Sequence, residues 1–431
     1  MNDPKGLSLI FRALHSRNYR LFFGGQGISL IGTWMQQIAM SWLVYRMTNS
    51  PFLLGLIGFS SQICSLFFSP FAGVISDRWN RHRILVATQS LAMIQAFILA
   101  VLTLTGAVTV PHLIILALFL GFVNAFDMPT RQAFVVEMVE KREDLANAIA
   151  LNSFLFNSAR LVGPSVAGIL ISILGEGMCF FLNAFSFLAV IVALLAMKIA
   201  YHKKGTQETQ ILQGFKEGFS YALGFPPIRS ILLFLGWISL VGTANTTLMP
   251  VFAKKILHGG PQTYGLLMAA IGAGAIIGAI FLASRRSVQG LGRIIVIASG
   301  IFGIGLISFS SSHTLWFSFS VLLLVGFGMM VQMASSNTIL QTMVDDDKRG
   351  RVMSLYVMAF MGMAPLGSLA GGSLAGAIGA PYTLAVGGVS CLLGSFMFTK
   401  KLPMIREMVR PIYIRKDILS ERSEMEISTD D

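Results

Sequence analysis

The sequence has little charge for its length. Of its 431 residues only 12% are charged, whereas 54% are hydrophobic, and the mean hydropathy is +0.72. A water-soluble surface needs more charge than this, so a soluble protein of two or three domains is excluded. In lipid, only helices and closed barrels satisfy their own backbone hydrogen bonds. Because the apolar runs are long and do not alternate with polar residues, the sequence predicts an all-α membrane protein.

Groups that carry out catalysis are also scarce. The three cysteines, Cys64, Cys179 and Cys391, lie far apart in apolar runs, where packing is a simpler role than a disulfide or a metal site. No G-x-x-x-x-G-K-[ST] loop occurs, which argues against direct use of ATP. No Ser-His-Asp or His-Cys arrangement can be argued either. We therefore expect no enzyme activity, no metal and no cofactor.

Long apolar runs, in contrast, are abundant. A helix needs about 20 apolar residues to cross a hydrocarbon layer of ~30 Å. Twelve runs approach or exceed that length and predict twelve transmembrane helices, at 21–45, 52–76, 84–107, 110–128, 147–174, 178–198, 229–253, 262–284, 294–311, 314–341, 353–378 and 381–399. Polar stretches at 129–146 and 345–352 separate the fourth from the fifth run of each set of six.

The two sets of six runs resemble each other. E-M-V at 137–139 matches T-M-V at 342–344, a separation of 205, and G-P-S-V-A-G at 163–168 matches A-P-L-G-S-L at 364–369, a separation of 201. Such similarity indicates a duplication, and it predicts two pseudo-symmetric six-helix bundles. The tail mixes both charges and lacks an apolar face, which predicts a flexible end. The expected boundaries are 1–200 for the first bundle, 201–228 for a cytoplasmic linker, 229–400 for the second bundle and 401–431 for the tail.

Basic residues are unevenly divided between the two sides of the predicted bundles. Of 32 Lys and Arg, Arg46, Lys254 and Lys255 fall outside and Arg160 falls within a span, so 32 − 4 = 28 fall inside. Cytoplasmic loops carry such an excess, which predicts that both termini are cytoplasmic. The net charge of +12 then indicates contact with anionic lipid head groups. No soluble module is long enough to offer nucleic acid a basic face.

A charged loop follows the second run. It reads G-V-I-S-D-R-W-N-R-H-R from residue 73, and it resembles the major facilitator loop pattern G-x-x-x-D-R-x-G-R-[KR] through Gly73, Asp77, Arg78 and Arg81. Asn80 replaces the second glycine of that pattern and tolerates a similar backbone. The resemblance implies a substrate site between two bundles and a cytoplasmic gate, in which Asp77 accepts hydrogen bonds from loop arginines or faces a helix N-terminus. The alternative is that the arginines only set the topology.

Longer stretches resemble one branch of the major facilitator superfamily. Residues 18–45, 125–139 and 150–160 are similar to the transmembrane secretion effectors that include the enterobactin exporter and the macrolide efflux pumps. The fifth run reads A-x-x-x-G-P-x-x-A-G at 159–168, which resembles the antiporter pattern g-x-x-x-G-P-x-x-G-G, in which Gly163 and Pro164 bend the helix. The resemblance implies export driven by proton exchange. The fourth run lacks the arginine of the R-x-x-x-G pattern found in many proton-coupled antiporters, so coupling through that residue is not expected.

One permanent charge lies well inside a predicted span. Arg160 is about 12 residues, or ~18 Å, from the cytoplasmic end of its run, and intramembrane charges are functional candidates by default. Its expected partners are cavity water, an amide or an anionic substrate, although it could instead only bind backbone carbonyls beside Pro164. Polar and aromatic residues at similar depth complete a predicted substrate cavity, although each could instead join helices: Trp34, Gln36, Gln37, Asn124, Asn157, Asn245, Gln332 and Asn337.

Asp127 is the candidate for proton coupling. A coupling site needs a carboxylate whose pKa has been raised by burial, and Asp127, at the end of the fourth run, is the best placed acid. It could equally cap the next helix or pair with Arg131.

The leading hypothesis is a secondary exporter that moves a small amphipathic molecule, such as a siderophore or a macrolide-like drug, out of the cytoplasm by alternating access. Its expected partners are that substrate, protons and membrane lipids. We expect a monomer in a bacterial inner membrane. Two alternatives stay open: a lipid or lysolipid translocator, and a transporter-like membrane sensor or scaffold that binds a ligand without moving it.

Overall fold

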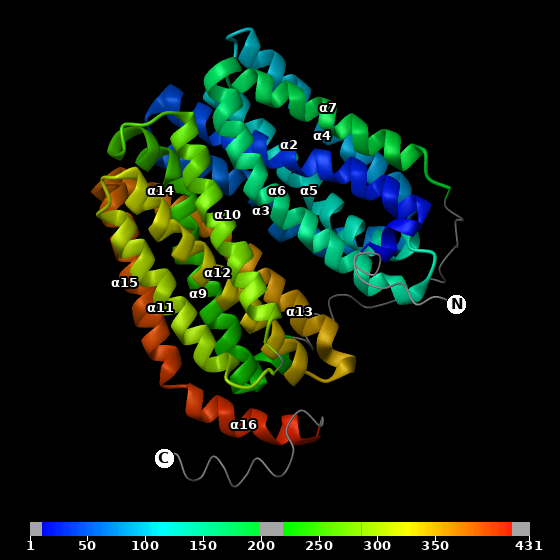
Figure 1. Cartoon of the computed structure of the whole chain (residues 1–431), viewed down its shortest axis with the longest axis vertical. Helices are drawn as coiled ribbons and strands as arrows, with labels where there is room; N and C mark the ends of the chain where they lie inside the picture. The colour runs from blue at the N-terminus through cyan, green and yellow to red at the C-terminus, as the bar shows by residue number, and fades with distance from the viewer. Residues whose placement is uncertain (1–10, 199–218, 286, 416–431) are drawn as a thin grey trace.

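The chain folds into long helices arranged in two groups (Figure 1). The computed structural model describes residues 11–198, 219–285 and 287–415, and no strand occurs among them. The first half contains η1 (Arg12–His15), α2 (Arg17–Thr48), α3 (Pro51–Arg78), α4 (Arg81–Leu104), α5 (Val110–Met138), η2 (Arg142–Asp144), α6 (Leu145–Leu174) and α7 (Glu176–Leu195). The second half contains α9 (Pro226–Val251), the π-turn η3 (Phe252–Ile256), α10 (Pro261–Ala283), α11 (Leu291–Ser310), α12 (Leu315–Met343), α13 (Asp346–Met361), α14 (Met363–Ile378), α15 (Ala380–Thr399) and α16 (Leu402–Arg415). The predicted all-α membrane fold is confirmed.

Eleven helices of the described residues are long and apolar enough to cross a membrane, with α13 and α14 taken as one span. Helix α2 is not among them, because glutamines within it lower its mean hydropathy. It nevertheless packs along α6 and α7 and satisfies polar side chains inside the first half. With α2 included, the crossings correspond to the twelve predicted runs.

Two predicted polar breaks are partly helical in the structure. Helix α5 continues from the predicted span through Pro129 to Met138, inside the expected break at 129–146. A proline removes one backbone hydrogen bond, but neighbouring helices can support the helix across it. Similarly, α13 begins at Asp346, within the expected break at 345–352. The fourth span of the first half and the fifth span of the second half are therefore longer than their apolar runs.

The predicted linker, 201–228, is shorter than expected at its C-terminal end. Residues 219–224 are helical, and α9 begins at Pro226. Proline suits the first turn of a helix, where its missing N–H would have no partner in any case. Residues 199–218 lie outside the described residues.

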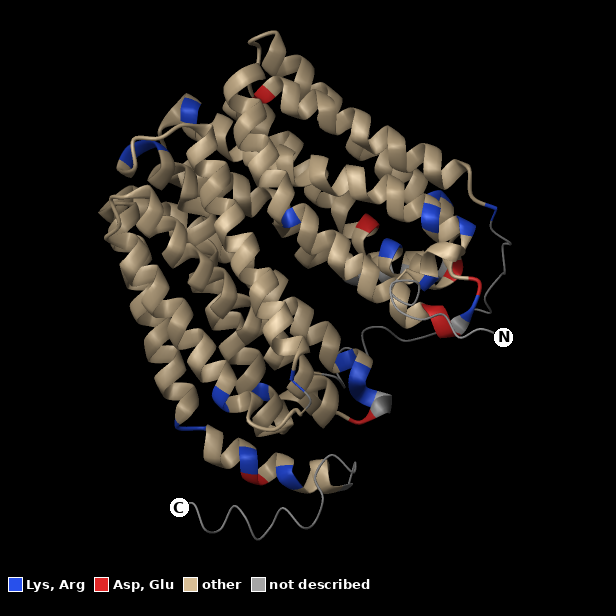
Figure 2. Ribbon diagram, viewed as in Figure 1, with Lys and Arg blue, Asp and Glu red and all other residues tan. Residues whose placement is uncertain are grey.

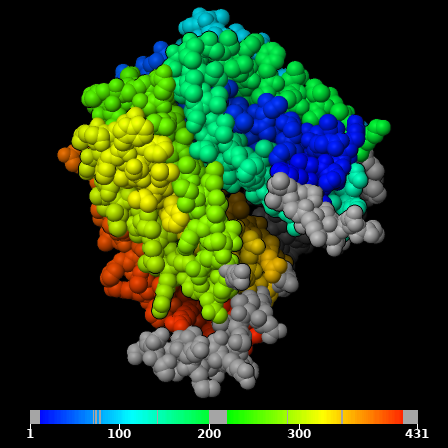
Figure 3. All heavy atoms as spheres, in the orientation of Figure 1, coloured from blue at the N-terminus to red at the C-terminus, as the bar shows by residue number. Residues whose placement is uncertain are grey.

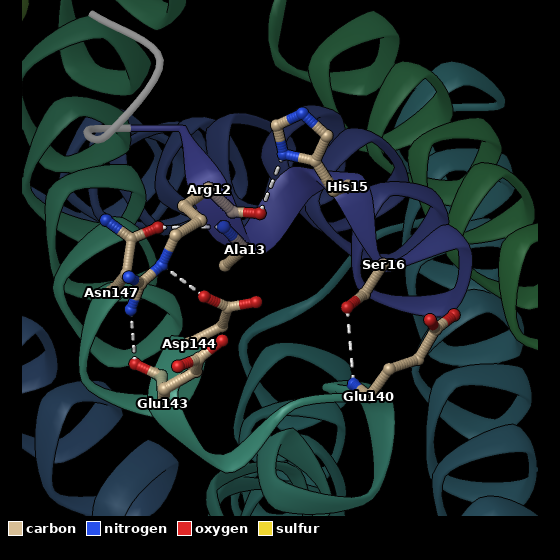
Figure 4. A network of polar contacts seen from close by, with 8 residues as sticks. All are labelled: Arg12, Ala13, His15, Ser16, Glu140, Glu143, Asp144 and Asn147. Carbon is tan, nitrogen blue, oxygen red and sulfur yellow. Dashed lines mark hydrogen bonds and ion pairs between the residues drawn. The ribbon is translucent and has the colours of Figure 1, made fainter. Parts of the chain in front are cut away.

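Both ends of the described chain lie on one side of the molecule, which we call the terminal side; the opposite side is the far side (Figure 1). Lysines and arginines are concentrated on the terminal side (Figure 2). On this side η1 is fastened to the loop between α5 and α6, as Figure 4 shows. Arg12 forms an ion pair with Asp144, and the backbone N–H of Ala13 donates to Asn147 Oδ1 at 2.9 Å. The N-terminal turn thus covers the terminal side of the first half.

The prediction that the whole tail, 401–431, lacks an apolar face is wrong. Helix α16 lies under the second half and buries Ile405 and Val409, with Tyr413 Oη 3.4 Å from Thr342 Oγ1. Apolar residues spaced three or four apart give the helix this face despite its mixed charges. Residues 416–431 lie outside the described residues.

Helix boundaries fix how the two halves align. Helices α5 and α12 both have 29 residues and start 315 − 110 = 205 apart, as the E-M-V and T-M-V match predicts. Helices α7 and α15 both have 20 residues and start 380 − 176 = 204 apart, each after a glycine with positive φ. The starts of α6 and α13 are 346 − 145 = 201 residues apart, as the predicted match of 163–168 with 364–369 requires, whereas the ends of α6 and α14 are 378 − 174 = 204 apart. Counted from the helix ends, Gly168 corresponds to Gly372.

Matched glycine contacts join the halves on the far side. A Cβ on Gly265 of α10 would stand 3.0 Å from Gly168 Cα of α6 and 2.5 Å from the carbonyl oxygen of Pro164. A Cβ on Gly55 of α3 would stand 2.9 Å from Gly372 Cα of α14. Small residues let helix backbones approach this closely in a membrane. The same contact therefore occurs twice, once on each side of the pseudo-symmetric assembly.

Side chains strengthen this closure. Trp42 of α2 stacks on Tyr264 of α10 with ring centroids 6.2 Å apart, and Lys254 Nζ donates to Asn49 Oδ1 at 2.8 Å. Toward the terminal side the two groups of helices diverge (Figures 1 and 3). The structure therefore shows the halves joined on the far side and apart on the terminal side.

Candidate functional site

Arg160 lies in the middle of α6, 160 − 145 = 15 residues after Leu145 and 174 − 160 = 14 before Leu174. Its guanidinium carbon is 5.9 Å from the centre of the Trp34 ring on α2, a cation–π distance. Among the described residues no carboxylate pairs with it. A charge at this depth is costly unless water or a partner compensates it. Arg160 is half-buried.

Arg160 belongs to the part of α6 that packs closely against α10. Its carbonyl oxygen is 3.2 Å from where a Cβ on Gly272 of α10 would stand. From this point to Gly168, α6 and α10 are packed together. The two groups of helices diverge toward the terminal side (Figure 1).

Trp34 is held in place by two neighbours on α6. A Cβ on Gly163 would stand 2.5 Å from Trp34 Cβ, and the ring of Phe156 meets the Trp34 ring edge-on with centroids 5.9 Å apart. Gly163 thus allows a close helix contact. Helix α6 is continuous across Pro164, and the predicted bend at Gly163 and Pro164 stays a prediction.

Four more residues of the predicted cavity are accessible. Gln37 is exposed, and Asn124, Asn157 and Asn337 are half-buried. Asn157 lies one turn before Arg160 on α6. The structure therefore places Trp34, Asn157 and Arg160 together, whereas Asn124 lies on α5 and Asn337 on α12.

Gln36 points away from the space between the halves, contrary to prediction. Its Nε2 donates to Gln95 Oε1 of α4 at 2.9 Å, and its Oε1 accepts from Asn183 Nδ2 of α7 at 2.7 Å. Ser186 Oγ donates to Asn183 Oδ1 at 2.9 Å. Depth alone does not determine which side of a helix faces a cavity, and adjacent glutamines on α2 point in different directions. Gln36 therefore joins three helices of the first half.

Asn245 and Gln332 also do not line the space between the halves in this conformation. Both are buried in the second half, on α9 and α12. Asn245 Oδ1 and Gln332 Nε2 have no hydrogen-bond partner among the described residues. Their assignment to the cavity is corrected for the same reason as that of Gln36, because their helices turn them into the bundle.

Asp127 lies deeper than predicted. It does not end its span, since α5 continues for 138 − 127 = 11 residues. Its Oδ1 accepts from Thr88 Oγ1 at 2.9 Å and from Gln89 Nε2 at 2.7 Å, and its Oδ2 is 2.8 Å from Arg131 Nη2. Of the two structural alternatives, pairing with Arg131 is thus observed and helix capping is not. The carboxylate is buried and held by three donors.

The predicted gate can be followed in part. Asp77 and Arg78 are the last residues of α3 and Arg81 is the first of α4, but the side chains of Gly73, Asp77 and Arg78 lie outside what the structure describes. Arg81 is buried and its Nη1 lies 3.0 Å from Glu137 Oε1 of α5. Arg81 therefore ties the loop to its own half. The gate between the halves stays a prediction.

Sequence reasoning missed several intramembrane amides. Gln26, Gln89, Gln95 and Asn183 are buried in the first half, and three of them bind Asp127 or Gln36. The available signal was their position inside apolar runs, where an amide needs a partner. Which amides meet could not be predicted, because that depends on how four helices face one another.

A second feature is a lateral groove of about 860 Å³ on the first half. It lies between the terminal-side end of α3, α4 and α5, and its walls include Trp79, Arg83, Leu91 and Phe122. Thr88, which donates to Asp127, also lines it. The groove is mostly apolar and lies within one half rather than between the halves.

Two similar six-helix halves, joined on one side of a membrane and apart on the other, define a membrane transporter and not an enzyme. Comparison with known families agrees. The chain belongs to the major facilitator family described as "Transmembrane secretion effector", whose model matches residues 10–417. The predicted family and branch are thus confirmed over nearly the whole chain.

Curated relatives are transporters of similar length. The Staphyloferrin A transporter of Staphylococcus aureus is 28% identical over 382 residues, covering 88% of this chain and 95% of that protein. The multidrug efflux pump Tap of Mycolicibacterium fortuitum is 23% identical over 397 residues, covering 89% and 93%.

Solved structures support the fold. A POT family transporter in complex with 5-aminolevulinic acid has a TM-score of 0.73 at 11% identity, covering 90% of this chain and 97% of that one. A bacterial homologue of the iron transporter ferroportin has a TM-score of 0.68 at 14% identity, covering 89% and 98%. At such identities the likeness shows the shared architecture alone.

Proposed function

We propose that this chain is a secondary exporter that moves a small amphipathic anion, of the siderophore or drug class, out of the cytoplasm by alternating access coupled to protons. The terminal side faces the cytoplasm of a bacterial inner membrane. The conformation described here is then open inward. The names of the relatives, a siderophore transporter and an efflux pump, support this substrate range.

The observation that carries the proposal is Arg160. It is the one side chain of the described transmembrane helices that places a permanent charge midway through a span without a carboxylate partner. It also stands beside the Trp34 ring. An anionic group with an apolar or aromatic body would satisfy both the guanidinium and the ring.

The test measures transport by Arg160→Ala and Arg160→Lys in cells that lack their own exporters. With Arg160→Ala, we expect the intracellular accumulation of a carboxylate siderophore to rise to the level seen with the empty vector. With Arg160→Lys, which keeps a positive charge, we expect an intermediate accumulation. Lys255→Ala, on the exposed far side, is the control and should leave export unchanged. If cells with Arg160→Ala still exported every siderophore and drug tested at the wild-type level, Arg160 would have no role in binding substrate.

Orientation and gating form a second test. A cysteine at Asn80, on the terminal side, should react with a membrane-impermeant thiol reagent only after cells are opened, whereas one at Lys255 should react in intact cells. Asp77→Asn should abolish efflux while leaving membrane insertion intact, if the loop closes the cytoplasmic side. Labelling of the Asn80 position in intact cells would contradict the proposed direction.

Lipid or lysolipid translocation is the second candidate, because the lateral groove has apolar walls with Arg83 among them. Such a groove suits an acyl chain with an anionic head group. Translocation of fluorescent lysolipid in proteoliposomes, reduced by Leu91→Trp but not by Arg160→Ala, would favour this function over export from the space between the halves.

A further inference from the structure

Three buried oxygens of the first half have no hydrogen-bond partner among the described residues: Gln26 Oε1 on α2, Gln89 Oε1 on α4 and Thr130 Oγ1 on α5. None of the three residues is more than 5% exposed. Buried polar atoms normally have partners, and the three belong to three different helices. Their coincidence therefore needs an explanation.

Helix geometry places the three oxygens in one layer. Phe22, Leu85 and Phe134 belong to a single packed cluster. Gln26 and Gln89 each follow their cluster residue by four positions on helices that run away from the terminal side. Thr130 precedes Phe134 by four positions on α5, which runs the opposite way. All three lie about one turn, ~5 Å, beyond the cluster toward the membrane centre.

Asp127 belongs to the same layer. It is three residues before Thr130 on α5 and accepts from Gln89 Nε2 at 2.7 Å. Because a carboxylate only accepts, this contact fixes the orientation of the Gln89 amide and turns its Oε1 elsewhere. We call Gln26, Gln89, Asp127 and Thr130 the Asp127 layer. It combines two amide carbonyls, one hydroxyl and one carboxylate, which are hard oxygen ligands.

We propose that the Asp127 layer binds a small, hard monovalent cation, either Na⁺ or hydronium, in exchange for the guanidinium of Arg131. The Asp127–Arg131 pair is neutral, so a cation added to it would leave an uncompensated buried charge. The side chain of Arg131 is 20% exposed, whereas that of Asp127 is 5% exposed. Arg131 can therefore withdraw toward water while the cation takes its place and the layer stays neutral.

The other charged or titratable groups on the surrounding helices are occupied or distant. Arg81 pairs with Glu137, His82 Nε2 contacts the Leu194 carbonyl at 2.8 Å, and Tyr19 Oη donates to the Ala148 carbonyl at 2.7 Å. These residues lie at least one turn nearer the terminal side than the layer. On α3, Cys64 is half-buried, and Asp77 and Arg78 are at its terminal-side end. Asp127 is thus the acid available at this depth.

This inference rests on the proposed ion-driven cycle and specifies where its ion binds. Two glutamines of α2 provide a matched test. Gln26 and Gln36 are each 2% exposed. Gln36 has both amide atoms paired within the first half, whereas Gln26 Oε1 has no hydrogen-bond partner among the residues that the structure describes. Replacing either by leucine removes an amide of the same helix. Only Gln26→Leu removes a ligand of the proposed cation.

The experiment measures the thermal unfolding midpoint of the purified full-length protein in detergent. One series compares Na⁺, K⁺ and choline chloride at equal ionic strength and pH 8; a second lowers the pH in choline chloride. We expect Na⁺, or acid, to raise the midpoint by about 3 °C relative to choline at pH 8, because a ligand of the native state stabilises it. Gln26→Leu should lose this response. Gln36→Leu should unfold at a lower midpoint but keep the response.

An equal response to Na⁺, K⁺ and choline with no effect of pH would overturn the inference, as would an unchanged response in Gln26→Leu. The measurement needs no substrate. Loss of export with a retained cation response would therefore count against the proposed function alone, and export without any cation response would count against this site alone.

Discussion

The two halves differ in charge at α5 and α12, although these two helices have the same length and align without a gap. With the 205-residue offset between α5 and α12, Asp127 corresponds to Gln332, Thr130 to Ser335 and Arg131 to Ser336. Within the part of the chain that the structure describes, Gln332 Nε2 and Ser335 Oγ are buried without hydrogen-bond partners, as Thr130 Oγ1 is. The second half therefore keeps a polar layer at this depth but not its charges. The proposed cation site thus has no charged counterpart at the aligned positions of α12.

In contrast, the contacts between the halves are symmetric. Gly55 meets Gly372 as Gly265 meets Gly168, with backbone atoms at similar distances. Both pairs of helices that join the halves need close backbone contact. The Asp127–Arg131 ion pair, in contrast, is found at these aligned positions in the first half alone. The following variants test this division, from the largest expected effect to the smallest.

Gly55→Ala and Gly265→Ala should be equally damaging if the closure is symmetric. Each new Cβ would stand 2.5–2.6 Å from a carbonyl oxygen of the other half, so we expect a loss of about 3 kcal/mol in the free energy of unfolding and a severe loss of transport. Gly376→Ala, where a Cβ meets nothing within 4 Å, is the control. A large difference between the two interface variants would contradict the symmetry.

Asp127→Asn and Gln332→Leu should separate the two polar layers. The first variant loses charge-assisted bonds to Arg131, Thr88 and Gln89, which should cost about 2 kcal/mol of unfolding free energy and abolish proton-driven transport. The second removes an amide that lacks one partner and should change stability by less than about 1 kcal/mol. Denaturation in detergent and transport in vesicles measure both. Equal effects of the two variants would mean that the Asp127–Arg131 charges contribute no more to stability or transport than the polar residues aligned with them.

Arg46→Ala tests a contact found in one half only. The side chain of Arg46 is 53% exposed and that of its partner Glu176 is 8% exposed, with Arg46 Nε 2.7 Å from Glu176 Oε1. The aligned residue of the second half is Ala380. We expect a loss of about 1 kcal/mol, smaller at high salt. A loss that does not depend on salt would point to packing instead.

Tyr413→Phe should have the smallest effect. Its hydroxyl is 3.4 Å from Thr342 Oγ1, which is a weak contact. The free energy of unfolding should therefore change by roughly 0.5 kcal/mol or less. Burial also raises the pKa of Tyr413, and the side chain stays neutral at physiological pH. Tyr413→Ala, which also removes the buried ring, should weaken the docking of α16 measurably. Equal effects of the two variants would show that α16 is not held by this ring.

Local patterns predicted most of the fold. Composition and run length were enough for the helices, and the 205-residue match of α5 with α12 is confirmed by their boundaries. The pattern failed where neighbours override local preference. Helix α5 crosses Pro129, and α16 finds an apolar face among charges, because packing against other helices supplies what each segment lacks.

The site was predicted less completely. Arg160 is identified from sequence because a lone charge deep in an apolar run is conspicuous, and Trp34 and Asn157 do lie near it. Gln36 and Gln332 are as polar and as deep, yet they point into their bundles. The sequence shows how deep in the membrane a residue lies along its helix. The direction in which its side chain points depends on how that helix is rotated relative to its neighbours.

The amino-acid sequence alone therefore determined that this protein lies in a membrane, how often it crosses, and which family it belongs to, because hydropathy and motif spacing are local properties of a chain. Only the tertiary structure decided that Asp127 is buried against Arg131 and Gln89, that Gln36 is a packing residue, and that the halves meet at paired glycines. These features depend on atoms brought together from helices far apart in the sequence.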